Sequence, residues 1–129
     1  MGSEIVVLCL AGLLHYVATF LTGRSQDKDM GHDYNVSPRD EPARYSTHTK
    51  RLQRAQRNHA ENLMLFTAAV VAVMWTGSNG VITAAAAWVY LAARVLYIPA
   101  YYYGWAPWRS IIFLFGSLAT LVMFVAALF

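Results

Sequence analysis

A cluster of charged residues occupies the junction between a polar and an apolar stretch, in residues 48 to 75. The segment reads HTKRLQRAQRNHAENLMLFTAAVVAVMW, and because neither Pro nor Gly interrupts it, it predicts one continuous helix. At 100° per residue, six polar side chains share about a third of the helix circumference. They are Lys50, Arg51, Arg54, Arg57, Asn58 and Glu61. Such a set can bind an anionic guest, because arginine forms paired hydrogen bonds with carboxylates.

A second polar stripe follows near residue 90. Tyr90, Arg94, Tyr97 and Tyr101 recur at helical spacing and share one face, and Arg109, followed by Ser110, is the one charge of the last apolar segment. A guest with two carboxylates, one ammonium and a thiol fits this inventory, with Glu61 taking the ammonium. To ionise a thiol at neutral pH, its pKa must fall by about 1.5 to 2 units, or about 2 to 3 kcal/mol. One arginine in a low-dielectric pocket can supply that.

These polar groups could also satisfy one another without any guest. Glu61 could pair with Arg57, four residues earlier, and with Arg94 on the next helix. Because one acid cannot neutralise five arginines, we favour the interpretation that the arginines bind an anionic ligand or are accessible to water. The four histidines show no metal-ligand spacing with cysteine or acids, and no metal site is expected.

Composition indicates an integral membrane protein. Hydrophobic residues make up 57% of the chain and charged ones 13%, against about 25% charged in soluble domains. We expect one all-α membrane domain over residues 1–129, a bundle of four membrane-spanning helices. The expected spans are about residues 4–22, 47–76, 81–103 and 107–129, with a polar loop at 23–46. Residues 63–75 are too few to cross a bilayer, which takes about 20 apolar residues. The polar face of the second span must therefore enter the membrane, where ionisable residues mark functional sites.

The basic residues predict the orientation of the chain. All ten Lys and Arg lie between Arg24 and Arg57 or at Arg94 and Arg109, which four spans place on one side of the membrane. The positive-inside rule assigns this side to the cytoplasm and both termini to the outside or the lumen. Because topology accounts for the net charge of +3, no nucleic-acid partner is expected.

Two segments carry a resemblance to a known family. RLQRAQRNHAEN at 51–62 resembles the second-span signature R-x-x-R-A-x-x-N-x-x-E of the MAPEG family, the membrane-associated proteins in eicosanoid and glutathione metabolism. RVLYIPAYYYGWAPWRS at 94–110 is similar to the region between that family's third and fourth spans. With four spans at matching intervals, the resemblance covers essentially the whole chain.

The resemblance implies a homotrimer of four-helix protomers that binds glutathione between neighbouring subunits. It implies that glutathione contacts Arg54, Arg57, Asn58 and Glu61 of one subunit and Tyr97 and Tyr101 of the next. Arg109 matches the arginine implicated in activating the thiolate, with Ser110 beside it. Arg51 and Arg94 match positions that line the pocket or support it.

We therefore expect a glutathione transferase or peroxidase that acts on lipophilic small molecules entering from the lipid bilayer. Its membrane would be a bacterial inner membrane or the endoplasmic reticulum, with the active site towards the cytoplasm. Two alternatives stay open. One is a non-catalytic lipid-binding or scaffold member of the family. The other is a small transporter, which would favour a polar track through the whole membrane.

Overall fold

The computed structural model describes residues 2–129, and these are helical wherever they have regular secondary structure. The four long helices are α1 (Ser3–Met30), α3 (Thr47–Trp75), α4 (Val81–Tyr102) and α5 (Trp108–Leu128). A short helix, α2 (His32–Val36), lies between the first two of them. The all-α class expected from the sequence is confirmed.

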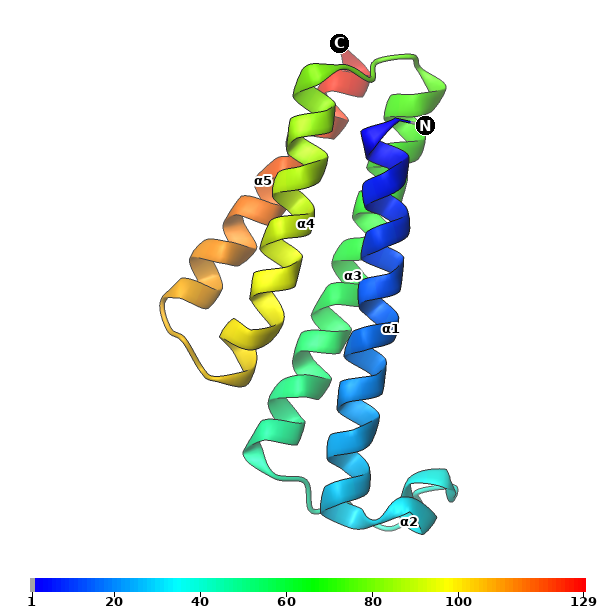
Figure 1. The fold of residues 1–129 in the computed structure, drawn as a ribbon, viewed down its shortest axis with the longest axis vertical. Helices are drawn as coiled ribbons and strands as arrows, with labels where there is room; N and C mark the ends of the chain where they lie inside the picture. The colour runs from blue at the N-terminus through cyan, green and yellow to red at the C-terminus, as the bar shows by residue number, and fades with distance from the viewer. Residues whose placement is uncertain (1) are drawn as a thin grey trace.

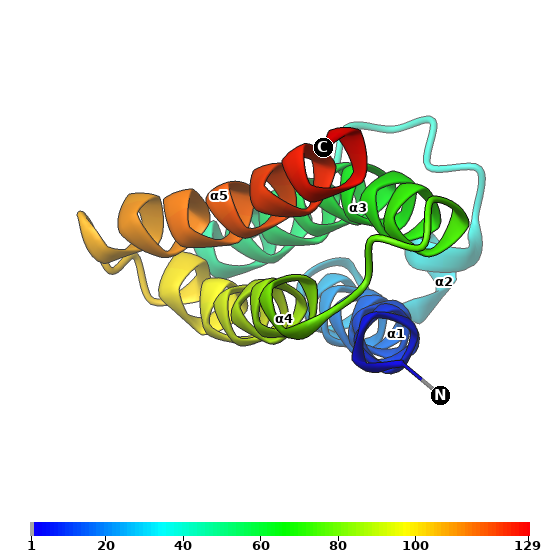
Figure 2. The same ribbon diagram turned by 90° about the horizontal axis from the view of Figure 1, so that it is seen from above.

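The long helices lie side by side with both termini at one end of the bundle (Figure 1). Seen along the bundle, α1 and α4 form one row, and α3 and α5 form the other (Figure 2). All ten Lys and Arg belong to the end that carries α2, since they lie in the last turns of α1, the connection to α3, the first half of α3, the second half of α4 and the start of α5. One end of the bundle is thus basic and the other has no cationic side chain among residues 2–129.

Helix α1 is longer than its apolar sequence predicts. We expected a loop from residue 23, yet the helix continues to Met30, where Gly31 ends it with a φ of 84°. Contacts with the start of α3 stabilise this polar extension. The carboxylate of Asp29 accepts hydrogen bonds from the Ser46 amide and the Thr49 hydroxyl, and Ser25 hydrogen-bonds to Thr49. Residues 23–30 are therefore a helical part of the bundle that is hydrogen-bonded to the start of α3.

Both ends of α3 follow local rules. At its start the hydroxyl of Ser46 accepts a hydrogen bond from the Thr49 amide at 3.2 Å, which caps the helix and satisfies one of the amides that a helix start leaves unpaired. At its end, the short segment 76–80 reverses the chain into α4, and Gly77 has a φ of 70°. Helices α3 and α4 are consequently antiparallel neighbours.

Three helices are long and apolar enough to cross a membrane: α1, α4 and α5. Helix α3 is not among them because its first half is charged. Large apolar side chains are exposed along the outside of the bundle, such as Phe20 and Leu121. The core lies towards the termini, where Phe66 and Tyr90 stack with ring centroids 3.9 Å apart. Gly116 lets α5 approach α4, since a Cβ there would lie 3.3 Å from that of Ala93.

Candidate functional site

A small pocket lies between α3, α4 and α5 in the basic half of the molecule. It has a volume of about 230 Å³ and is lined by Asn58, Tyr97, Arg109, Ser110 and Phe113. These residues come from three helices that are far apart in the sequence. Four of the five, all but Phe113, were expected in the site. The resemblance placed Asn58 and Tyr97 on neighbouring subunits, whereas this pocket brings the two together within one chain.

The guanidinium of Arg109 is held at this pocket by aromatic rings. It lies 4.8 Å from the centroid of the Tyr101 ring, and that ring meets Tyr97 edge to face at 5.7 Å. Phe113, one helical turn after Arg109, adds a third ring at 6.3 Å from Tyr97. A cation above an aromatic face is attracted by its quadrupole, so the arrangement fixes Arg109 without neutralising it. The charge remains free to attract an anion.

Behind the pocket, Arg94 is buried in the bundle. It is 2% exposed, and its guanidinium lies 4.5 Å from the centroid of the Tyr97 ring. Its Nε donates a hydrogen bond to Nδ1 of His59 at 3.3 Å. The resemblance implied that Arg94 either lines the pocket or supports it, and in the structure it lies behind the pocket, against Tyr97.

His59 contributes to the contacts behind the pocket, although the sequence did not indicate it as a site residue. Its side chain is fully buried, and Nε2 lies 3.0 Å from the carbonyl oxygen of Ala11 on α1. Since Nδ1 accepts from Arg94, the ring is neutral with its proton on Nε2, which donates to that carbonyl. The sequence does carry a pattern that predicts burial of His59. A seven-residue spacing is typical of a helix face packed on its neighbours, and it relates Leu52, His59, Phe66 and Val73, which are all buried.

Most of the charged residues in the polar stripe of α3 are exposed to the surroundings of the single chain. Arg54, Arg57 and Glu61 are all exposed. Among residues 2–129 the one ion pair joins His32 to Asp27, so within the protomer Glu61 pairs with neither Arg57 nor Arg94. The ion pairs by which these groups could neutralise one another are therefore not formed within the single chain.

The members of the stripe also separate to different sides of α3. Arg57 lines a second hollow, of about 470 Å³, together with His15, Gln53, Gln56 and Ala60. Asn58 faces the pocket of Arg109 and accepts a hydrogen bond from the Asn62 amide. One residue step turns a helix by 100°, which is enough to send these two neighbours apart.

Arg51 has a structural contact. Its Nη1 donates to the carbonyl oxygen of Tyr102 at 3.2 Å, and its guanidinium lies against Gly104 in the turn between α4 and α5. A Cβ on Gly104 would come within 3.2 Å of that group, and the residue has a φ of 68°. Arg51 therefore fixes the turn that leads to Arg109.

Chemically, the pocket offers hydrogen-bond donors and one uncompensated cation beside aromatic walls. Arg109, Ser110 and Asn58 can bind a carboxylate or a thiolate, and the exposed stripe of α3 adds two arginines and a carboxylate. This set of donors and charges fits a small anionic ligand.

The chain matches the model of the MAPEG family over residues 5–129. No curated protein and no solved structure matches it. The match confirms the family that the segments at 51–62 and 94–110 indicated. Membership of a membrane family, together with three apolar helices long enough to cross a membrane, explains why so many apolar side chains are exposed on the bundle. The chain belongs to the MAPEG family of membrane proteins, a family of glutathione and eicosanoid metabolism.

Proposed function

We propose that the protein is a glutathione-dependent transferase or peroxidase acting on lipophilic electrophiles, assembled as a homotrimer with four membrane-spanning helices in each protomer. The observation that carries the proposal is the guanidinium of Arg109, held over Tyr101 at the mouth of a polar pocket. Family membership supplies the substrate class.

The size of the pocket supports a site shared between subunits. Small-molecule sites are usually clefts of about 300–1,000 Å³, whereas this pocket measures about 230 Å³. We infer that it forms one wall of a larger site. Arg54, Arg57 and Glu61 are exposed on α3, and a bilayer would not tolerate them facing lipid. A neighbouring subunit or a bound substrate must cover this stripe, and α3 can then serve as the fourth span.

The residues divide into binding and activating groups. The arginines of α3 would bind the glutathione carboxylates, and Glu61 its ammonium, while Tyr97, Tyr101 and Ser110 shape the pocket around the sulfur. Arg109 would stabilise the thiolate. Its charge lies in a site walled by aromatic rings, where the local dielectric constant is lower than in water and its attraction for an anion is stronger.

The two alternatives fit these observations less well. A lipid-binding scaffold has no need for the hydrogen-bonding side chains of Asn58 and Ser110 beside Arg109 in a polar pocket. A transporter needs a polar path across the membrane, but the half of the bundle towards the termini is filled by side chains such as Phe66, Val73 and Met123.

Ultraviolet difference absorbance near 240 nm, recorded while glutathione is added to the detergent-purified protein, tests the proposal. We expect a thiolate band in the wild type and its loss in Arg109→Ala. Equilibrium dialysis should show that Arg109→Ala still binds glutathione. Arg44→Ala removes the same charge from an exposed position outside the pocket and should leave the band unchanged. Absence of glutathione binding in the wild type would refute the transferase proposal and favour the scaffold.

A further inference from the structure

A groove at the basic end of the molecule is separate from the pocket of Arg109. It has a volume of about 1250 Å³ and lies between the end of α1, the start of α3 and the end of α4. We call it the basic groove. Its lining residues are Phe20, Leu21, Arg24, Ser25, Asp27, Lys28, Asp29, His32, Ser46, His48, Leu52, Ile98, Pro99, Tyr102 and Tyr103. None of them lines the pocket of Arg109.

The basic groove lies on the opposite side of α3 from the polar stripe. On the helical wheel, His48 and Leu52 are about 120° and 160° from Arg54. These angles place the groove on a different face of α3 from Arg54, Arg57 and Glu61. Phe20 and Tyr103, at its edges, are 62% and 61% exposed, as expected of side chains that meet lipid.

The lining changes from apolar to cationic along α1. Phe20, Arg24 and Lys28 follow one another at four-residue intervals and so share one face of the helix. The Arg24 guanidinium lies 5.9 Å from the centroid of the Phe20 ring. Arg24 is about 4.5 Å beyond Leu21, the last large apolar residue of the span, and Lys28 about 10 Å beyond it. Arg24 therefore lies within the headgroup region of a bilayer, about 5–8 Å thick on each side, and Lys28 lies just beyond its outer edge.

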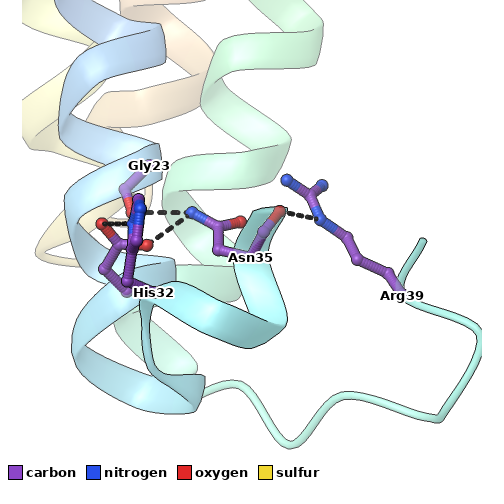
Figure 3. A network of polar contacts seen from close by, with 5 residues as sticks. Gly23, His32, Asn35 and Arg39 are labelled. Atoms are coloured by element: carbon purple, nitrogen blue, oxygen red, sulfur yellow. Dashed lines mark hydrogen bonds and ion pairs between the residues drawn. The ribbon is translucent and has the colours of Figure 1, made fainter. Parts of the chain in front are cut away.

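The carboxylates of the groove are already engaged by the protein. Asp29 accepts hydrogen bonds from Ser46 and Thr49 at the start of α3. Asp27 accepts one from the side-chain amide of Asn35 at 2.7 Å and pairs with His32 at 3.6 Å. Figure 3 shows Asn35 of α2 directed at α1, with its amide also bonded to Gly23. In contrast, Arg24 and Lys28 form no ion pair with any carboxylate of residues 2–129.

Two free cations above an apolar wall have the chemistry of a lipid site. We propose that the basic groove binds an anionic phospholipid, whose phosphate is held by Arg24 and Lys28 and whose acyl chain lies along Phe20, Leu52 and Ile98. Basic pockets between membrane helices bind acidic headgroups in this way. The proposal requires that α1 and α4 cross a bilayer, and it does not depend on glutathione chemistry.

Native mass spectrometry of the full-length protein in detergent tests this, with phosphatidylglycerol and phosphatidylcholine of identical acyl chains added in parallel. We expect phosphatidylglycerol to be retained preferentially. Each basic residue near a membrane surface contributes about a fivefold gain in affinity for anionic lipid, so Arg24→Ala with Lys28→Ala should weaken its retention about thirtyfold. Phe20→Ala should cause a smaller loss for both lipids, because it removes only apolar wall.

The matched control is Arg39→Ala with Arg44→Ala, which removes the same charge from exposed positions outside the groove and should change retention less than threefold. Equal retention of the two lipids by the wild type, or equal losses in both double variants, would overturn the proposal. Arg109→Ala should bind phosphatidylglycerol like the wild type, so failure of the glutathione site and failure of the lipid site can be told apart.

Discussion

Replacing His59 by Leu tests whether the buried contact behind the pocket stabilises the fold. The side chain is fully buried, and its Nδ1 accepts the 3.3 Å hydrogen bond from Nε of Arg94. Leucine has a similar volume but no acceptor, so Arg94 would keep its charge with a buried donor unpaired. Hydrogen bonds to charged groups contribute about 1.5–3 kcal/mol to the free energy of unfolding. For a chain of this length that corresponds to a fall in Tm of about 5 to 12 °C.

Thermal unfolding in detergent, followed by tryptophan fluorescence, measures this change. His48→Leu is the control, since His48 is exposed and stacks on Tyr102, and its Tm should stay within about 2 °C of the wild type. His59→Gln should recover part of the loss, because its amide oxygen can accept from Arg94. If His59→Leu and His48→Leu unfold at the same temperature, the hydrogen bond to Arg94 contributes nothing and the reasoning fails.

Two further predictions concern packing and capping. Gly116→Leu should lower the free energy of unfolding by about 1–3 kcal/mol, because its Cβ would lie 3.3 Å from that of Ala93. Gly12→Leu is the control and should not lower it, because no heavy atom lies within 4 Å of a Cβ at that position. Equal Tm values for the two variants would argue against close α4–α5 packing. Ser46→Ala should cost about 1 kcal/mol and speed hydrogen exchange at the Thr49 amide, which the hydroxyl of Ser46 now binds. Asn79→Ala, at an exposed position in the turn at the other end of α3, is its control, and unchanged exchange at Thr49 in Ser46→Ala would exclude the cap.

Features set by local geometry could be predicted from the sequence. The Tyr90, Arg94, Tyr97 stripe depends only on helical periodicity, and all three side chains are buried on one face of α4. The N-cap at Ser46 and the reversal before Val81 follow in the same way from the residue types that such positions prefer. The family was likewise visible in residues 51–62 and 94–110, and the family match confirms it.

Features that depend on a neighbouring helix could not be predicted. The helical wheel gives the direction of a side chain but not the element that it meets, so Arg57 and Asn58 looked like one binding face although they line different hollows. The polar end of α1 is helical because Asp29 and Ser25 contact α3, and no local pattern reports those contacts. The expected joint site of α3 and α4 in adjacent subunits stays a prediction.

Helix α1 is unbroken from Ser3 to Met30, so a change in its tilt within the bilayer would also move its end beside the start of α3. The apolar part of α1, about residues 4–22, extends about 28 Å, close to the thickness of about 30 Å of a hydrocarbon core, and its polar turns continue the same helix to Met30. A helix answers a thinner bilayer by tilting, and because α1 is unbroken the tilt reaches its far end. About 10° around the midpoint would carry Met30 sideways by roughly 4 Å. The hydrogen bonds from Ser46 and Thr49 to Asp29 are then the place where the protein would sense the thickness of its membrane.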